Sequence, residues 1–198
     1  MYPNVIKKLI NNFKDFPGVG DKSAERLAFS LINFDDEQLE NFSNVIIEVK
    51  EKISKCKICG SICEGEYCDI CMNKSRNKKI IFVVEKPKDI FLFERIGVFN
   101  GVYHVLGNLI SPLDGINPDD ITIDRLIERI KENDCEEIIM ALKPSIEGET
   151  TMQYIKKIVE PLDIKVSKIA TGIPMGTEME YIDTMTLEMA LEERKDIS

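Results

Sequence analysis

The sequence of 198 residues has no long hydrophobic run, and its purely apolar stretches, such as residues 80–84, are short. A helix that crosses a membrane needs about 20 consecutive apolar residues. The first residues, Met1 to Asn4, lead directly into an amphipathic segment without the layout of a secretion signal. We therefore expect a cytoplasmic protein that makes no contact with a membrane.

Catalytic signatures are also scarce. The chain lacks the pattern G-x-x-x-x-G-K-[ST], so the sequence offers no P-loop to hold a nucleotide for hydrolysis. The single histidine, His104, lies in an apolar segment, which favours a place in the core over a catalytic role. Cys135 is likewise expected to be a plain buried residue and not a nucleophile.

Positive charge is in short supply, with 26 Lys and Arg against 35 Asp and Glu and a formal net charge of −9. This balance argues against a simple binder of polyanions, because nucleic-acid affinity depends on Lys and Arg neutralising phosphates. The acid is unevenly distributed: residues 1–80 carry 13 basic and 12 acidic residues, and the remainder carries 13 and 23. The first 80 residues are therefore near neutral, with local basic clusters.

The apolar pattern predicts several modules. Helical spacing predicts three helices, over residues 5–13, 23–33 and 35–53, in one small helical unit. From residue 80 onward, predicted strands (80–84, 103–106, 137–142 and 164–170) alternate with predicted helices (89–96, 121–131 and 150–159). That alternation is typical of a parallel sheet covered on both faces, and a last helix is predicted over residues 184–194. The fold class is therefore α+β with several modules.

Five of the six cysteines fall within residues 56–71. Cys56 and Cys59 form one C-x-x-C pair, and Cys68 and Cys71 form another after an eight-residue gap. Two such pairs can hold one tetrahedral zinc ion, and four thiolates leave no open position, which indicates a structural site. The alternatives are a redox dithiol or unrelated thiols. Cys63 could replace one ligand, although its spacing fits the pattern worse.

Nearby cations are available to balance the negative charge of such a zinc centre. A zinc ion with four thiolates carries net negative charge, which neighbouring cations would offset. Lys52, Lys55 and Lys57 lie nearby in the sequence.

A glycine-containing turn, Phe16-Pro17-Gly18-Val19-Gly20, separates the first two predicted helices. Its glycines allow backbone N–H groups to crowd together at the start of the second helix, which is a phosphate-binding arrangement. Lys22 and Arg26 are four residues apart and share a helical face beside the turn. The string resembles the helix-hairpin-helix motif, which grips a DNA backbone without reading its sequence. The alternative is an ordinary helix–helix connection.

Carboxylates follow two of the predicted strands. Glu85 comes directly after residues 80–84, and Glu147 and Glu149 come shortly after residues 137–142. The carboxyl ends of parallel strands are where such sheets place ligands. The pattern resembles the Toprim fold of topoisomerases and primases, whose carboxylates hold Mg²⁺ for phosphoryl transfer. Here Glu-x-Glu stands where Toprim enzymes use Asp-x-Asp, and a scaffold without catalysis is favoured over an enzyme.

The order of these modules resembles the bacterial RecR family over almost the whole chain. The resemblance divides the chain into a helix-hairpin-helix domain (1–54), a four-cysteine zinc finger (55–77), a Toprim domain (78–172) and a C-terminal oligomerisation segment (173–198). Besides the cysteines, the matching strings are residues 16–28, 103–107, 111–116, 147–151, 172–176 and 180–183. The departures from the family's usual residues are Asn108, Lys143, Thr171 and the added thiol of Cys63.

The resemblance implies a DNA-repair protein that is not an enzyme. Family members act with RecO and RecF, help RecA load at gapped or single-stranded DNA, and assemble into rings, typically tetramers. In this chain it implies that Lys22 and Arg26 face DNA, that Gly18 and Gly20 shape the turn, and that the acidic surface around Glu147 meets a basic partner such as RecO. Residues 172–194 resemble the part that packs between subunits. A Mg²⁺-dependent nuclease or phosphoryl-transfer enzyme is the alternative.

Overall fold

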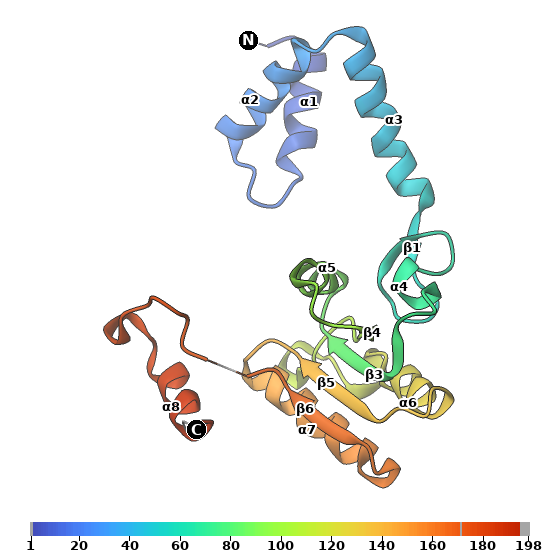
Figure 1. Cartoon of the computed structure of the whole chain (residues 1–198). Coiled ribbons are helices and arrows are strands. Elements are labelled where there is room, and N and C mark those ends of the chain that lie inside the picture. Colours follow the sequence, from blue (N-terminus) through green and yellow to red (C-terminus); the bar gives the residue numbers. More distant parts are fainter. Residues whose placement is uncertain (1, 171, 195–198) are drawn as a thin grey trace. The chain divides into compact units, whose positions relative to one another are not determined.

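The structure is a computed structural model that describes residues 2–170 and 172–194. The chain divides into two compact units, Met1–Ile53 and Ser54–Ser198 (Figure 1). Thr171, one of the departures from the family pattern, lies outside the described residues. Residues 195–198, the end of the predicted C-terminal segment, also lie outside them.

The first unit consists of helices. Helix α1 (Asn4–Lys14) packs against α2 (Asp21–Ile32). Ala24 and Ala28 of α2 are both 0% exposed, and their small side chains let the two helices approach closely. The rings of Tyr2 and Phe29 add an edge-on contact with centroids 5.5 Å apart. The first two predicted helices are thus confirmed.

Helix α3 (Asp36–Lys52) begins at a capping box. The Asp35 carboxylate accepts a hydrogen bond from the Gln38 amide at 2.8 Å, and the Gln38 side chain accepts one from the Asp35 amide at 3.2 Å. The third predicted helix is thus confirmed. None of the residues of α3 is buried, and its exposed apolar side chains include Phe42, Val45, Ile46 and Val49. An apolar face left in water points to a partner surface.

The second unit begins with the cysteine-rich segment. Two short strands, β1 (Ile53–Lys55) and β2 (Ile62–Glu64), form a two-stranded sheet, and the one-turn helix α4 (Asp69–Met72) follows. Apolar periodicity does not predict these elements, because each is only three or four residues long.

A four-stranded parallel sheet forms the centre of the second unit. Its order is β4 (Gly101–Val105), β3 (Asn77–Val84), β5 (Glu137–Ala141) and β6 (Lys165–Lys168). All three neighbouring pairs are parallel, as predicted. Since β3 lies between β4 and β5, the chain leaves β3 toward one edge and later returns to its other side. Such a reversal of strand order marks the place where α/β sheets bind ligands.

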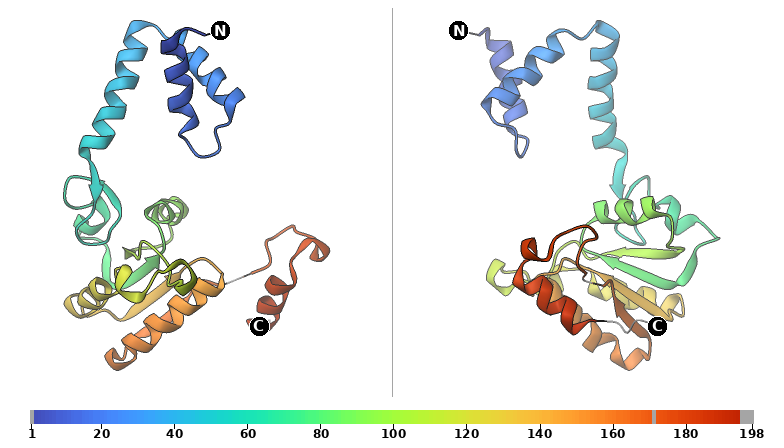
Figure 2. Two further views of the ribbon diagram at one scale, coloured as in Figure 1. Left: turned by 180° about the vertical axis from the view of Figure 1, so that it is seen from behind. Right: turned by 60° about the vertical axis from the view of Figure 1, so that its left-hand side comes forward.

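Helices cover both faces of this sheet (Figure 2). Ile81 and Val83 point to one face and pack with α6 (Ile123–Glu132) and α7 (Ile146–Val159). Phe82 and Val84 point to the other and pack with Ile90 of α5 (Pro87–Ile96). Alternate residues of a strand face opposite ways, so one continuous apolar strand serves two cores.

The remaining elements are short. Helix α8 is Thr184–Glu192, and 3₁₀ turns occur at Pro112–Asp114, Pro118–Asp120, Glu160–Leu162 and Met179–Tyr181. Within the described residues, no helix has the length and apolar character needed to span a bilayer.

The predicted core position of His104 is confirmed. The side chain is buried in β4, and its Nε2 atom lies 3.0 Å from the carbonyl oxygen of Thr122 and 2.9 Å from its hydroxyl. Burial, with help from the nearby charge of Arg129, lowers the pKa of His104 to about 3, so the ring is neutral at physiological pH.

Candidate functional sites

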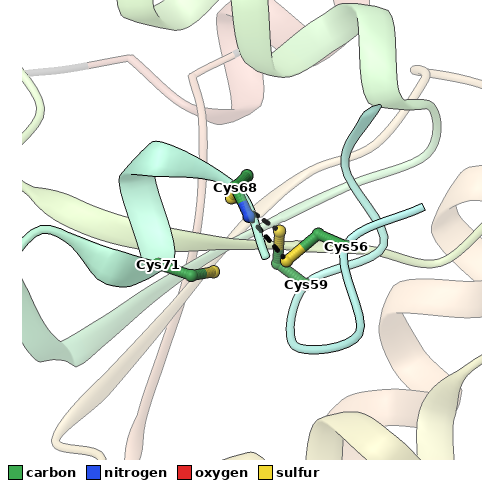
Figure 3. A group of neighbouring side chains, drawn as sticks. All are labelled: Cys56, Cys59, Cys68 and Cys71. Carbon is green, nitrogen blue, oxygen red and sulfur yellow. Dashed lines mark hydrogen bonds between the residues drawn. The ribbon is translucent and has the colours of Figure 1, made fainter. Parts of the chain in front are cut away.

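Four cysteines converge at the start of the second unit (Figure 3). Cys56 and Cys59 come from the turn after β1, and Cys68 and Cys71 come from the start of α4. Their sulfur atoms all lie within 4.8 Å of one another, and all four residues are buried. The structure thus brings together the four cysteines that the two C-x-x-C pairs predict, and the cluster is compatible with a zinc site.

The sulfur geometry fits a tetrahedral ion. Four Zn–S bonds of about 2.3 Å put neighbouring sulfurs about 3.8 Å apart, and the sulfurs of Cys59 and Cys68 are 3.6 Å apart. Hydrogen bonding to Cys68 raises the pKa of Cys59 to about 12, while hydrogen bonding from Cys59 lowers the pKa of Cys68. Sulfurs this close cannot all ionise without a cation among them, because the thiolates repel one another.

Cys63 lies beside this cluster and is not a member of it. It is partly exposed, and its sulfur donates a hydrogen bond to the carbonyl of Gly65 at 3.4 Å. Two of the three nearby lysines are paired with glutamates: Lys57 pairs with Glu66, and Lys52 pairs with Glu48.

The turn between α1 and α2 has a backbone suited to an anion. Gly18 has φ +81°, a left-handed conformation that side-chain-bearing residues rarely adopt. Gly20 is the N-cap of α2 and provides no side-chain cap. Within the described residues, the amides of residues 20–23 donate no hydrogen bond. These free N–H groups at a helix N-terminus form the arrangement that binds phosphate.

Two cations stand on the helix beside this turn. Lys22 and Arg26 are exposed, and neither forms an ion pair within residues 2–170 and 172–194. Lys14, at the end of α1, pairs with Asp21 across the turn. Sequence reasoning did not find Lys14, since its place depends on how α1 packs against α2. The turn therefore has three cations around it, one of them already paired.

Glu85 occupies the predicted position at the carboxyl end of β3. Its side chain is 17% exposed and lies 3.0 Å from the Lys86 ammonium. The hollow beside it is lined by Glu85, Lys86, Lys88, Asp89 and Lys143, with apolar groups from α5 and β5. Lys143, a departure from the family pattern, adds positive charge here. Three ammonium groups around two carboxylates make this hollow unfavourable for Mg²⁺.

Glu147 and Glu149 lie in the first turn of α7, which begins four residues earlier than predicted. Only glycine fits between them, because a Cβ on Gly148 would lie 1.9 Å from the carbonyl oxygen of Lys143. A hydrogen bond from Ser145 keeps the pKa of Glu147 below its usual range, and Glu149 lies 3.6 Å from the Lys168 ammonium. These carboxylates suit the positive end of a helix dipole.

The acidic residues do not gather around one point. Within residues 2–170 and 172–194, the four cysteines are the only group of three or more candidate ligands that converge. Glu85 therefore does not share an ion site with Glu147 and Glu149 in this structure.

Comparisons with known proteins cover nearly the whole chain. A family model described as "RecR, helix-hairpin-helix" matches residues 6–50, one described as "Toprim domain" matches 79–170, and one described as "RecR, C-terminal" matches 172–195. Proteins named "Recombination protein RecR" are similar end to end. That of Lactobacillus johnsonii is 42% identical over 99% of both chains, and that of Acidothermus cellulolyticus is 43% identical over 100% of this chain and 99% of its own. That of Lactobacillus helveticus is 45% identical over 98% of both.

Proposed function

This chain belongs to the RecR family of recombination proteins, and on that premise we propose that it is a DNA-binding mediator of recombinational repair and not an enzyme. The observation that carries the proposal is the turn at residues 16–20. Its free amides and two unpaired neighbouring cations, Lys22 and Arg26, are suited to phosphates and not to bases. Binding would therefore be independent of sequence, to single- or double-stranded DNA.

The proposed division of labour follows the modules. Residues 1–54 bind DNA, residues 55–77 hold one structural zinc ion, residues 78–172 form the Toprim scaffold and residues 173–198 join subunits. The family matches at 6–50, 79–170 and 172–195 support these boundaries. The zinc assignment is supported by the make-up of the cluster, which consists of four buried thiols, the ligand type that selects soft metal ions.

We further propose that the chain works with RecO and RecF to help RecA load at gapped or single-stranded DNA. Family membership supports this, as does the acidic surface around Glu147, where Asp114 adds like charge beside the cation of Lys143. A basic protein partner such as RecO would complement that surface. The place of action is then the cytoplasm, at the nucleoid.

A ring-shaped oligomer, most simply a tetramer, is part of the proposal. No residue of α3 is buried, and Val45 is 45% and Val49 is 55% exposed, so the helix offers an apolar face that a second subunit could cover. Light scattering should give four chain masses, and replacing both valines by aspartate should lower that mass because the face becomes charged. A wild-type monomer at micromolar concentration would contradict the proposed ring. The same light-scattering measurement with RecO added tests the partnership, because a complex has a larger mass than this protein alone.

The competing function is a Mg²⁺-dependent nuclease or phosphoryl-transfer enzyme. Supercoiled plasmid incubated with the protein and Mg²⁺ should be retarded in a gel, and should return to its supercoiled position once protease removes the protein. Nicked or linear plasmid, lost in Glu85→Gln, would instead establish the enzyme. We expect intact plasmid, because Glu85 is paired with Lys86 and, among the described residues, belongs to no converging group of three or more candidate metal ligands.

A further inference from the structure

Arg129 is a buried cation without an acidic partner. It lies on α6 and is 5% exposed. Within the described residues it forms no ion pair, and its Nε atom is buried with no hydrogen-bond partner. Arginine is almost never buried unless it is paired, because moving its charge out of water is costly. The structure should therefore supply a negative charge near it.

The guanidinium is held against the outer edge of the sheet. Its Nη1 atom donates a hydrogen bond to the carbonyl of Tyr103 at 2.6 Å and lies 3.2 Å from Nδ1 of His104. Arginine can only donate, so Nδ1 of the neutral imidazole accepts and Nε2 carries the proton that faces Thr122. These contacts fix one end of the guanidinium and leave Nε uncommitted.

The cysteine cluster meets the same edge of the same strand. The amide of Val105 donates to the carbonyl of Cys59 at 2.8 Å. Residues two apart in a strand direct their backbone groups to the same side, so Tyr103 and Val105 place Arg129 and Cys59 side by side along β4. Burial lowers the pKa of Arg129, and the thiolates of Cys71, Cys59 and Cys56 act against that effect.

A loaded metal centre would supply the missing negative charge. A divalent ion with four thiolates has a net charge of about −2, and the four cysteines are buried. Of the nearby lysines, Lys52 and Lys57 are exposed and paired with glutamates. We propose that Arg129 is the buried countercharge of the four-cysteine metal centre and positions that centre against β4. The cation and the metal centre then offset each other's cost of burial.

This inference rests on the proposed zinc site and is independent of DNA binding. It predicts that binding or loss of the metal changes the environment of α6 and β4, which lie outside residues 55–77. Groups outside the ligand shell commonly change metal affinity by about 10–100-fold when they are removed.

The test compares zinc affinity by chelator competition in the full chain. Arg129→Met should bind zinc at least tenfold more weakly than wild type. Arg129→Lys keeps the positive charge but loses the planar set of N–H donors, so its zinc affinity should lie between those of wild type and Arg129→Met. Lys131→Met removes the same charge from an exposed position on the same helix and should leave affinity unchanged. Affinities of Arg129→Met and Arg129→Lys within twofold of wild type would overturn the proposal.

A second readout does not depend on affinity, and it stands if Arg129→Met fails to fold. The chain has six arginines, and arginine-specific ¹⁵N labelling would resolve the Nε–H signal missing from Arg129→Lys. That signal should shift when zinc is replaced by cadmium or removed, while the signal of exposed Arg95 stays fixed. An unmoved Arg129 signal refutes the countercharge. Wild-type protein that binds no zinc would refute the zinc site first, and so the two failures are distinguishable.

Discussion

Replacing both Lys22 and Arg26 by alanine should weaken DNA binding by about tenfold or more at low salt, and should reduce the salt dependence of binding. Each phosphate contact contributes about 1 to the slope of log affinity against log salt, so the slope per bound chain should fall by about 2. The residues are exposed and unpaired within the described chain, so the change leaves the packing of Ala24 and Ala28 intact. Fluorescence anisotropy with labelled DNA at several salt concentrations measures both quantities.

The matched control removes two charges elsewhere. Lys156 and Lys157 are exposed on α7 in the second unit, and Lys156→Ala/Lys157→Ala changes net charge by the same amount. If this control lost as much affinity and slope as Lys22→Ala/Arg26→Ala, DNA would be responding to overall charge and the turn would not be the site. Two unrelated DNA sequences should bind equally to wild type, since phosphates carry no sequence information.

Much of this candidate site could be predicted from local sequence. The turn is recognisable because its determinants are contiguous: a left-handed glycine at Gly18, a helix start at Gly20 and cations one turn apart. The pairing of Lys14 with Asp21 could not be predicted, because it depends on the angle at which α1 returns beside α2. Local patterns determine backbone conformation well, whereas ion pairs across a turn are set by packing.

The second unit shows the same division. The predicted strands coincide with the four strands of the sheet, but the predicted start of α7 at residue 150 is too late. The helix begins at Ile146 because Ser145 accepts a hydrogen bond from the Gly148 amide, and Gly148 is a poor helix former that periodicity rejects. The cysteine spacing predicted the metal ligands. Arg129 is separated from them by more than fifty residues, and only the sheet edge brings it near.

Removing one ligand of the four-cysteine centre should have the largest effect on folding. Wild-type protein freed of loose ions should contain about one zinc per chain, and Cys71→Ala should contain none and lose the structure of residues 55–77. Structural zinc sites contribute about 10–16 kcal/mol of apparent binding free energy at pH 7, which a three-thiolate site forfeits in large part. The loss should extend to edge strand β4, because Val105 donates its amide hydrogen bond to Cys59. Metal analysis and hydrogen exchange of residues 101–105 measure the two effects.

Cys63→Ala is the matched control, since Cys63 lies beside the cluster without joining it. It should keep its zinc, while a thiol reagent should modify Cys63 quickly in loaded wild-type protein and reach the ligands only after chelation.

Zinc should also be released as pH falls, because protons compete for thiolates that must be ionised to bind the metal. Wild-type protein with no zinc and a disulfide between Cys56 and Cys59 would identify a redox dithiol instead. Four buried sulfurs within 4.8 Å of one another argue against that result, because a redox dithiol needs only one pair whereas a tetrahedral metal site needs all four.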